Sequence, residues 1–464
     1  MSDYIYMLES HLSPDQNRVV AEVQKAAEPA GINLFLTGGA MRDMLGGFRI
    51  RDLDFVVEGS ALKLAKTVCE QSGARMIAFD ENRKSAELVF PSGVTAQIAM
   101  SRQEKYARAG AKPQVSPATI QEDLRGRDFT CNSIALSLNR ASRGLLLDPM
   151  NGLADIGRRE LRATSAYGFY DDPTRLLRLE RFRIRLAFTL EERTRMQVAN
   201  AREAEVEKLI PPRALAEEMK RIAMEDSPAD ILKALDEAGL LVLFSSSLSG
   251  AKLNLAGIGK FEKLARMLPD EGLARVTRFG PFLYALTEKL TPRERQAFPK
   301  ALDMPKEDTD LWLKLEPRAK KFETALRSAR LRKPSQVYHL VAAAPPDEVL
   351  LLLYRSTFKP VQDRLRAYFQ KYLPAVQEIT AEEWAAVEGK PGTPRYAKAR
   401  QDFVSHRLDR RPPRKPAEPV VPAPAPPEPA VVPRVRPTGE RSRGAGVQSG
   451  GTLENPATTQ SKQV

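Results

Sequence analysis

Hydrophobic and polar positions near the start of the chain follow helical spacing in some segments and strand-like spacing in others. Apolar residues three or four apart predict helices, and short apolar runs bounded by turn residues predict strands. The expected helices cover 14–30, 40–45 and 60–73, and the expected strands cover 34–37, 52–58, 86–90 and 94–100. The last two strands flank Pro91-Ser92-Gly93 and form a hairpin. The mixture predicts a small α+β domain whose sheet carries helices on one side.

The rest of the chain has mainly helical spacing. Apolar residues recur at helical spacing beyond about residue 155, and 411–464 is rich in proline. Such a proline-rich, polar segment buries too little apolar surface to fold, so we expect disorder there. The predicted fold class is therefore an α+β head followed by all-α neck, body and tail domains. The expected parts are a head (1–145), a neck (146–210), a helical body (211–275), a helical tail domain (276–390), and a basic linker with a disordered tail (391–464).

Composition narrows the class of protein. The 464 residues carry 72 Lys and Arg against 59 Asp and Glu, a net charge of +13 that favours a polyanionic partner such as nucleic acid. Two cysteines, Cys69 and Cys131, and three scattered histidines exclude a disulfide scaffold and a Cys/His metal cluster. Free thiols and a start unlike a signal peptide predict a cytoplasmic protein. No apolar stretch is long enough to span a membrane.

Two carboxylates two residues apart mark the second predicted strand. Because side chains alternate along a strand, Asp52 and Asp54 share one face while Leu53 takes the other. Adjacent carboxylates suit Mg²⁺ ions that bridge a substrate phosphate. The alternative is an exposed strand edge whose acids pair with Arg49 or Arg51.

A glycine turn before these acids supports the metal interpretation. Gly38 and Gly39 lie between the first predicted strand and a short helix, where backbone N–H groups can approach a triphosphate. Arg42 on that helix is a candidate for a phosphate contact. Taken alone, the glycines also fit an ordinary tight turn.

Four segments together resemble one family. They are LTGGAMRDMLGGFRIRDLDFVVEG (36–59), EDLRGRDFTCNSIALSL (122–138), LLLDPMNGLADIGRRELR (145–162) and FYDDPTRLLRLERFRIRLAFTLEERT (169–194). In order and spacing they resemble the motifs of class II tRNA nucleotidyltransferases and bacterial poly(A) polymerases, within the polymerase-β-like nucleotidyltransferases. The resemblance covers about residues 31–245.

This resemblance implies a function. The expected enzyme adds CCA, or CC or A alone, to tRNA 3′ ends from CTP and ATP, and releases pyrophosphate without a template. Its cofactor would be Mg²⁺, held by the catalytic Asp52 and Asp54, and its partner the acceptor end of tRNA, bound by the body and tail domain. A poly(A) polymerase shares these motifs and stays open as an alternative.

The start of the predicted helix after residue 172 has two interpretations. By the resemblance, Asp172 and Arg175 select the nucleotide base, and Arg178 on the same helix is a further nucleotide-binding residue. From the residues alone, Asp172 is the N-cap, Pro173 opens the helix, and the arginines occupy a solvated face. The row Arg175, Arg178, Arg181, Arg183 and Arg185 also suggests a grip on RNA phosphates.

A further nucleotide-binding group is expected at the second motif. By the resemblance, Arg127 contacts a phosphate and Asp128 the sugar. Asn132 shares a face with Asp128 if 130–138 is helical. The alternative is an ion pair at a helix N-terminus. Gly126 stands where the family usually has an arginine, which puts triphosphate affinity in doubt.

A second departure from the family lies in the hairpin. Gln97 stands where the family usually has a third acid, five residues before the segment Arg102, Glu104 and Tyr106. If 91–93 is a three-residue loop, Glu87 lies opposite Gln97 on the same face and supplies the missing charge. Gln97 and Gly126 also keep open a third interpretation, a catalytically weakened RNA-binding relative.

Overall fold

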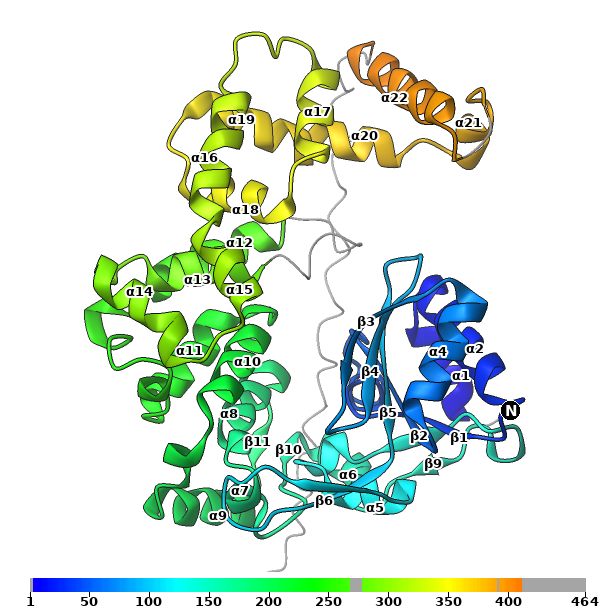
Figure 1. Cartoon of the computed structure of the whole chain (residues 1–464), viewed down its shortest axis with the longest axis vertical. Helices are drawn as coiled ribbons and strands as arrows, with labels where there is room; N and C mark the ends of the chain where they lie inside the picture. The colour runs from blue at the N-terminus through cyan, green and yellow to red at the C-terminus, as the bar shows by residue number, and fades with distance from the viewer. Residues whose placement is uncertain (1–2, 268–277, 390–391, 411–464) are drawn as a thin grey trace, which may run out of the picture. The chain divides into compact units, whose positions relative to one another are not determined.

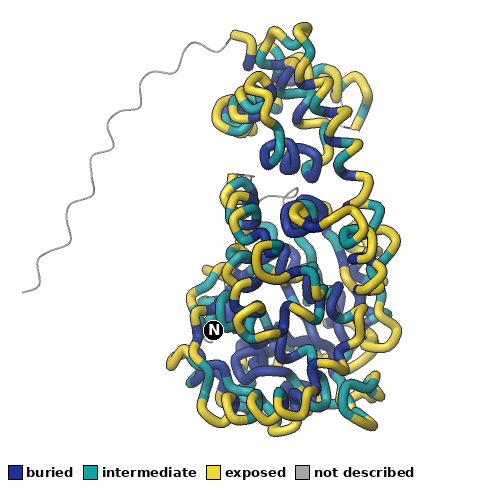
Figure 2. The backbone as a smooth tube through the Cα atoms, turned by 90° about the vertical axis from the view of Figure 1, so that its left-hand side faces the viewer, coloured by how far each residue is buried: buried dark blue, intermediate teal, exposed yellow. Residues whose placement is uncertain are grey.

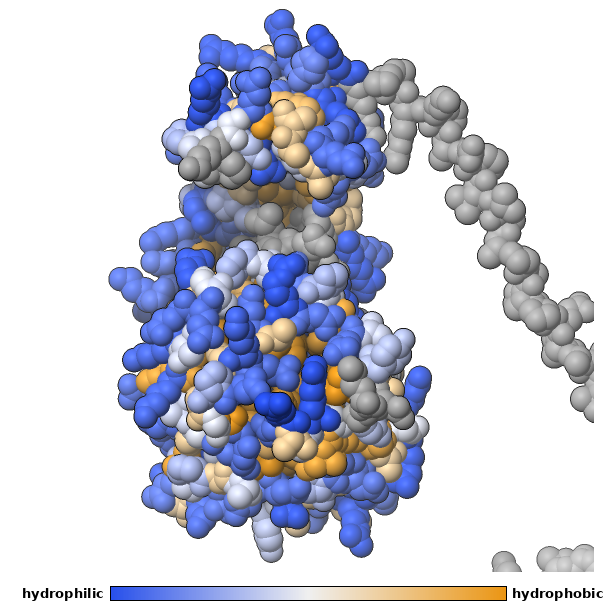
Figure 3. Space-filling model, turned by 90° about the vertical axis from the view of Figure 1, so that its right-hand side faces the viewer, coloured by the Kyte–Doolittle hydropathy of each residue, from blue (hydrophilic) through white to orange (hydrophobic). Residues whose placement is uncertain are grey.

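The computed structural model describes residues 3–267, 278–389 and 392–410 (Figure 1). The expected disordered tail, 411–464, and the expected boundary between body and tail domain at 275/276 lie outside these residues. Among the described residues, no helix is long and apolar enough to cross a membrane. The face seen in Figure 3 is mostly hydrophilic, with small separate hydrophobic patches.

The head is built on a seven-stranded mixed sheet with the strand order β3-β4-β5-β2-β1-β8-β9. β2 runs antiparallel to β1 and parallel to β5, which places it near the middle of the sheet. The strands are β1 (Asn33–Thr37), β2 (Leu53–Glu58), β3 (Arg75–Asp80), β4 (Ser85–Val89), β5 (Thr95–Met100), β8 (Ala135–Ser137) and β9 (Leu146–Leu147). A separate ribbon pairs β6 (Arg102–Lys105) with β7 (Gln114–Pro117).

Helices cover both faces of this sheet, so the expectation of helices on one side is wrong. α1 (Asp3–His11), α2 (Pro14–Ala27), α3 (Gly39–Leu45) and α4 (Ala61–Ser72) join Leu53 and Phe55 in the main core. On the opposite face, Phe35 and Val56 pack against α5 (Ile120–Gly126) in a separate cluster. Strand alternation produces both layers, because successive side chains of β1 and β2 point to opposite faces.

Two local predictions need correction. Residues 130–138 form a short 3₁₀ turn, Thr130–Asn132, followed by strand β8, not one helix. Asp172 lies one position before the N-cap, which is Pro173, and its carboxylate accepts hydrogen bonds from the backbone and hydroxyl of Thr174. It therefore caps the helix from one residue further out than predicted.

The neck, body and tail are helical. A short parallel pair, β10 (Glu160–Leu161) with β11 (Thr189–Leu190), is the exception. The predicted stripe Leu176, Leu179, Phe182 and Leu186 is buried. The neck helices are α6 (Gly152–Arg158), α7 (Gly168–Asp171), α8 (Thr174–Leu186) and α9 (Glu192–Glu203). The body helices are α10 (Pro212–Ala223), α11 (Pro228–Glu237) and α12 (Leu255–Ala265).

Short helices build the region after residue 278. They are α13 (Phe279–Thr287), α14 (Pro292–Ala301), α15 (Lys306–Leu313), α16 (Leu315–Leu326), α17 (Pro334–Ala342), α18 (Pro346–Arg355), α19 (Lys359–Ala367), α20 (Leu373–Gln377), α21 (Ala381–Ala385) and α22 (Pro394–Asp409). Figure 2 shows buried and exposed stretches alternating along the backbone of these helices.

The linker expected from residue 391 contains a sixteen-residue helix, α22. Its Val404 and Leu408 pack in a small core with Ala375 and Ile379. Asp409 accepts hydrogen bonds from the backbone and hydroxyl of Ser335. The segment is therefore an integral part of the tail helices.

Candidate active site

The acid pair lies at the start of β2. Asp52 is exposed and immediately precedes the strand, and Asp54 is half-buried within it. Leu53 is fully buried on the opposite face, as the alternation predicted. Burial, together with the neighbouring charge of Asp52, raises the pKa of Asp54 to about 6. The two carboxylates are therefore close enough to repel each other.

The glycine turn lies directly against Asp54. Gly38 has φ +64° and ψ −122°, and a Cβ placed on it would lie 3.4 Å from Asp54 Oδ2 and 3.0 Å from Arg127 Nη1. The Gly39 N–H also donates to Asp54 and lowers its pKa. Because the two glycines have no side chains, space stays open between the Asp54 carboxylate, the backbone N–H groups of the turn and the Arg127 guanidinium.

The donor set at this point fits a divalent cation. Two carboxylates share one small region, where burial and the charge of Asp52 together raise the pKa of Asp54 although Arg127 and Arg42 oppose the shift. Oxygen ligands of this kind suit Mg²⁺ completed by water and substrate phosphate. Within the described ranges, no group of three or more His, Cys, Asp or Glu side chains is placed to hold a metal, so the protein itself offers a partial ligand shell.

Arg127 borders the acid pair. It donates to Asp123 Oδ2 at 2.9 Å, to Thr37 Oγ1 at 3.1 Å and to the Asn132 carbonyl at 3.3 Å. Sequence reasoning missed Thr37 and Asp123. Thr37 directly precedes the glycine turn, and Asp123 lies four residues before Arg127 on α5, a spacing that signals an ion pair.

Arg42 is placed differently from the expectation. Its side chain is 3% exposed and donates to Asp43 at 2.7 and 2.9 Å and to Asn132 Oδ1 at 2.7 Å. Its guanidinium also lies over the ring of Phe182 at 5.1 Å. These partners occupy the group that was expected to hold a phosphate, so Arg42 supports the wall of the site from inside.

Asp128 is also engaged within the protein. Its Oδ1 accepts from Asn132 Nδ2 at 2.9 Å, and its Oδ2 accepts from Arg178 Nε at 2.9 Å. Although burial opposes it, Arg178 holds the pKa of Asp128 well below its usual range. The structure thus brings Asp128 and Asn132 together without the helix on which that prediction depended.

Arg175 is fixed at the junction of head and neck. Its Nη1 and Nη2 donate to the carbonyls of Arg127 and Gly126 at 3.1 and 3.0 Å. A Cβ on Gly168 would approach Nη1 to 2.9 Å, so the backbone lies tightly against the guanidinium. Each of the other arginines of α8 has an acid partner within the protein. The pairs are Arg178–Asp128, Arg181–Glu218, Arg181–Glu225, Arg183–Glu180 and Arg185–Asp43.

The segment Arg102, Glu104 and Tyr106 forms one hydrogen-bonded group. Glu104 accepts from Arg102 Nε at 2.9 Å and from the Tyr106 hydroxyl at 2.7 Å. Burial and the Glu104 carboxylate raise the pKa of Tyr106 well above its usual range, with a smaller contribution from Asp172. The Tyr106 hydroxyl therefore stays protonated. The contribution of Asp172 shows that this hydrogen-bonded group lies close to the start of α8.

The hairpin has the predicted register. Phe90 N donates to the Val94 carbonyl at 2.9 Å across the loop 91–93, and Glu87 pairs with Gln97. Gln97 pairs in turn with Asp54 on β2. The three side chains therefore follow one another across a single face of the sheet.

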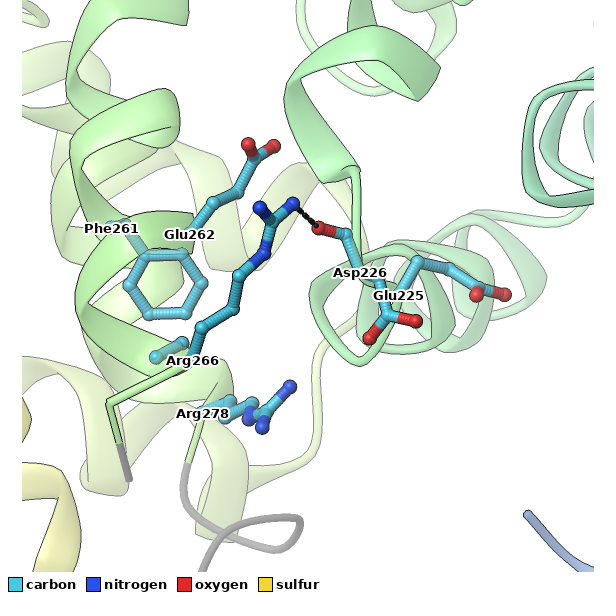
Figure 4. Close-up of a pocket in the computed structure, with 7 residues that line it drawn as sticks. Glu225, Asp226, Phe261, Glu262, Arg266 and Arg278 are labelled. Carbon is cyan, nitrogen blue, oxygen red and sulfur yellow. Dashed lines mark hydrogen bonds between the residues drawn. The ribbon is translucent and has the colours of Figure 1, made fainter. Parts of the chain in front are cut away.

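A polar cavity of about 450 Å³ lies between the end of α10 and helix α12 (Figure 4). Arg266, at the end of α12, reaches across to the other side, where its Nη2 donates to the Asp226 carbonyl at 3.1 Å. Glu225 on that side accepts from Arg51 at 2.9 Å. Since Arg51 directly precedes Asp52, this pair ties the body to the strand that carries the acids.

A mixed sheet with two neighbouring acids beside a glycine turn, followed by a helical neck, defines a polymerase-β-like nucleotidyltransferase. The Poly A polymerase head domain family matches residues 34–162. A CC-adding tRNA nucleotidyltransferase from Deinococcus radiodurans is 31% identical over 288 residues, which cover 62% of this chain and 74% of that protein. The chain belongs to the tRNA nucleotidyltransferase and poly(A) polymerase family.

Other relatives extend the comparison. An A-adding tRNA nucleotidyltransferase from Aquifex aeolicus is 28% identical over 344 residues, covering 73% of this chain and 40% of that protein. A second, from Halalkalibacterium halodurans, is 34% identical over 254 residues, covering 53% of this chain and 59% of that protein. The chain thus spans about half the length of these A-adding relatives. A solved CCA-adding enzyme in its apo form II shares the fold, with a TM-score of 0.52, 22% identity and coverage of 88% of this chain and 95% of that one.

Proposed function

We propose that the protein is a template-independent RNA nucleotidyltransferase that adds CCA, or CC or A alone, to tRNA 3′ ends from CTP and ATP, in the cytoplasm. The observation that carries the proposal is the acid pair, Asp52 and Asp54, against the Gly38-Gly39 turn with Arg127 beside it. The names of its relatives support tRNA as the acceptor, since they add A or CC to tRNA.

The residues divide the chemistry between them. Asp52 and Asp54 would hold Mg²⁺, which would supply positive charge for the triphosphate and a Lewis acid for the RNA 3′-hydroxyl. The RNA 3′-hydroxyl attacks the α-phosphorus, and pyrophosphate leaves. The Gly38-Gly39 turn lets backbone N–H groups approach the phosphates. Arg127 supplies a charge-assisted contact to the same phosphates.

Base selection belongs to Asp172 and Arg175. A guanidinium has five N–H donors, and the two bonds from Arg175 to carbonyls fix its plane while leaving donors for a base edge. Asp172 adds an acceptor at the start of α8, where Thr174 orients its carboxylate. Arg178 and Asp128 hold this helix against the head and position the pair.

RNA binding belongs to the helices beyond the neck. Between α16 and α17, three basic residues that are not buried lie close together in sequence: Arg330, Arg332 and Lys333. Each phosphate that a basic side chain neutralises steepens the salt dependence of binding. We therefore expect replacement of all three by alanine to reduce the slope of log affinity against log salt concentration by roughly 0.7–0.9 for each phosphate no longer neutralised, whereas Lys66→Ala on α4 of the head leaves the slope unchanged. An unchanged slope in the triple variant would contradict this assignment.

Incorporation on tRNAs shortened at successive 3′ positions tests the proposed function. Each tRNA receives labelled CTP or ATP separately with Mg²⁺. Addition of C to the shorter ends, of A to tRNA ending in CC, or of both, supports the proposal and identifies which nucleotides are added. Extension of oligo(A) by ATP in preference to tRNA would identify a poly(A) polymerase instead. Binding of tRNA without incorporation of either nucleotide would identify a weakened relative.

A further inference from the structure

One row of side chains crosses five adjacent strands of the head. The paired positions are Ala78 on β3, Glu87 on β4, Gln97 on β5, Asp54 on β2 and Thr37 on β1. Paired positions on neighbouring strands project from the same face. Asp54 of the candidate cation site therefore projects from the same face of the sheet as the paired side chains on the four other strands.

Within this row only Glu87 can add charge to Asp54. Gln97, the direct neighbour of Asp54, offers a carbonyl oxygen but no charge. Thr37 offers a hydroxyl and Ala78 offers nothing. Glu87 is two strand spacings, or roughly 10 Å, from Asp54, with only Gln97 between them.

Glu87 is available for this task. Its residue is exposed, whereas Ala86 and Leu88 on either side are buried in the core. Among the described residues it makes no ion pair or side-chain hydrogen bond that would hold it elsewhere. The flanking core residues and the three-residue loop fix its position on the strand, because a shift by one residue would bury the charge.

We propose that Glu87 supplies the negative charge that Gln97 lacks at the cation site formed by Asp52 and Asp54. Its charge acts on the cation from two strands away, across Gln97, and not as a direct ligand, because no group of three acids among the described residues is placed to hold a metal. This inference rests on the proposed function, which it deepens by naming a further residue for the same reaction.

A set of exchanges between glutamate and glutamine tests the inference. The variants are Glu87→Gln, Gln97→Glu and the two combined. Glu70→Gln is the matched control, since Glu70 is a glutamate on α4, which packs on the opposite face of the sheet. The first measurement is the Kd for Mn²⁺, determined by electron paramagnetic resonance on the full chain with a non-hydrolysable CTP analogue. The second is nucleotide incorporation with Mg²⁺.

We expect Glu87→Gln to weaken Mn²⁺ binding and to lower kcat, each by about 10-fold or more. The combined variant regains both, because Gln97→Glu returns an acid to the same row. Glu70→Gln keeps the wild-type values. Equal Mn²⁺ affinity in Glu87→Gln and Glu70→Gln would overturn the inference. So would a loss in Glu87→Gln that the combined variant does not restore, since that pattern belongs to a structural role.

The two proposals fail in different ways. If the wild-type protein incorporates no nucleotide on any RNA, the proposed function fails, while the Mn²⁺ affinities still decide whether Glu87 contributes to the cation site. If the wild-type protein is active and Glu87→Gln matches it in both measurements, only the inference about Glu87 fails.

Discussion

Gly38 links the stability of the head to the geometry of the active site. Its φ of +64° with ψ −122° lies in a region that side chains other than glycine rarely adopt, and occupying it costs about 1–3 kcal/mol. An added Cβ would also lie 3.0 Å from Arg127 Nη1, tighter than an ordinary contact. We expect Gly38→Ala to destabilise the head by about 2 kcal/mol and to displace Arg127 from Asp54.

Gly39 is the matched control. It has no positive φ, and its Cβ would lie 3.6 Å from both Asp54 Oδ2 and Arg42 Nη2, which is ordinary contact. Because Gly39 begins α3 and alanine favours helices, Gly39→Ala should leave the stability of the head unchanged or slightly higher. Comparing the stability of Gly38→Ala with that of Gly39→Ala therefore separates the effect of backbone strain from the effect of an added methyl group.

The assay must observe the head alone. Both tryptophans, Trp312 and Trp384, lie in α15 and α21, so fluorescence reports the tail helices. Amide hydrogen exchange in β1 and β2 reports the head. We expect Gly38→Ala to speed this exchange by about 30-fold, the equivalent of 2 kcal/mol, with tryptophan unfolding unchanged. Equal exchange in Gly38→Ala and Gly39→Ala would refute the reasoning.

Three further predictions follow from single contacts. A Cβ on Gly126 meets nothing within 4 Å, so Gly126→Arg should fold normally and lower the KM for the triphosphate by about tenfold; an unchanged KM would contradict the family comparison at this position. Arg181→Met removes the 2.6 Å partner of buried Glu218, which keeps Arg221 at 3.3 Å. The loss in urea unfolding should therefore lie near the lower end of the range for a broken buried pair, about 3 kcal/mol, and adding Glu218→Gln should recover part of it. A loss below about 1 kcal/mol would argue against this pair. Because Arg178 lowers the pKa of Asp128 in the folded state, their stabilisation should be complete above about pH 4 and lost as the pH falls through that lowered pKa; Asp128→Asn should remove this acid dependence.

Local patterns in the sequence were sufficient for the hairpin, the acid pair and the glycine turn of the head. The register of β4 with β5 depends on a three-residue loop and on alternating burial, so Glu87 opposite Gln97 was predictable from adjacent residues. The acid pair and the glycine turn are likewise short-range features.

Local sequence patterns do not predict ion pairs between residues that lie far apart in the sequence. The arginines of α8 resemble an RNA-binding row, but Arg181 pairs with Glu218, 37 positions away, and Arg185 with Asp43, 142 positions away. A single sequence gives no signal for pairs at such separations. The network instead joins the neck to the head and body.

The secondary structure of two segments differs from the prediction for a different reason. Residues 130–138 form a short, fully buried strand after a turn, and a short apolar run does not distinguish a helix from a strand. Helix α22 is strongly polar, and only Val404 and Leu408 mark its buried side. Tertiary packing, not local spacing, decides both.

The most direct test of the central claim replaces the acid pair. Wild-type protein, Asp52→Asn and Asp54→Asn are compared for incorporation of CTP and ATP into tRNA lacking its 3′ end, and for the Kd of Mn²⁺ with a non-hydrolysable triphosphate. The account predicts that the wild type extends the tRNA and that each variant loses incorporation by at least about 100-fold together with Mn²⁺ affinity. Full incorporation by either variant would contradict it.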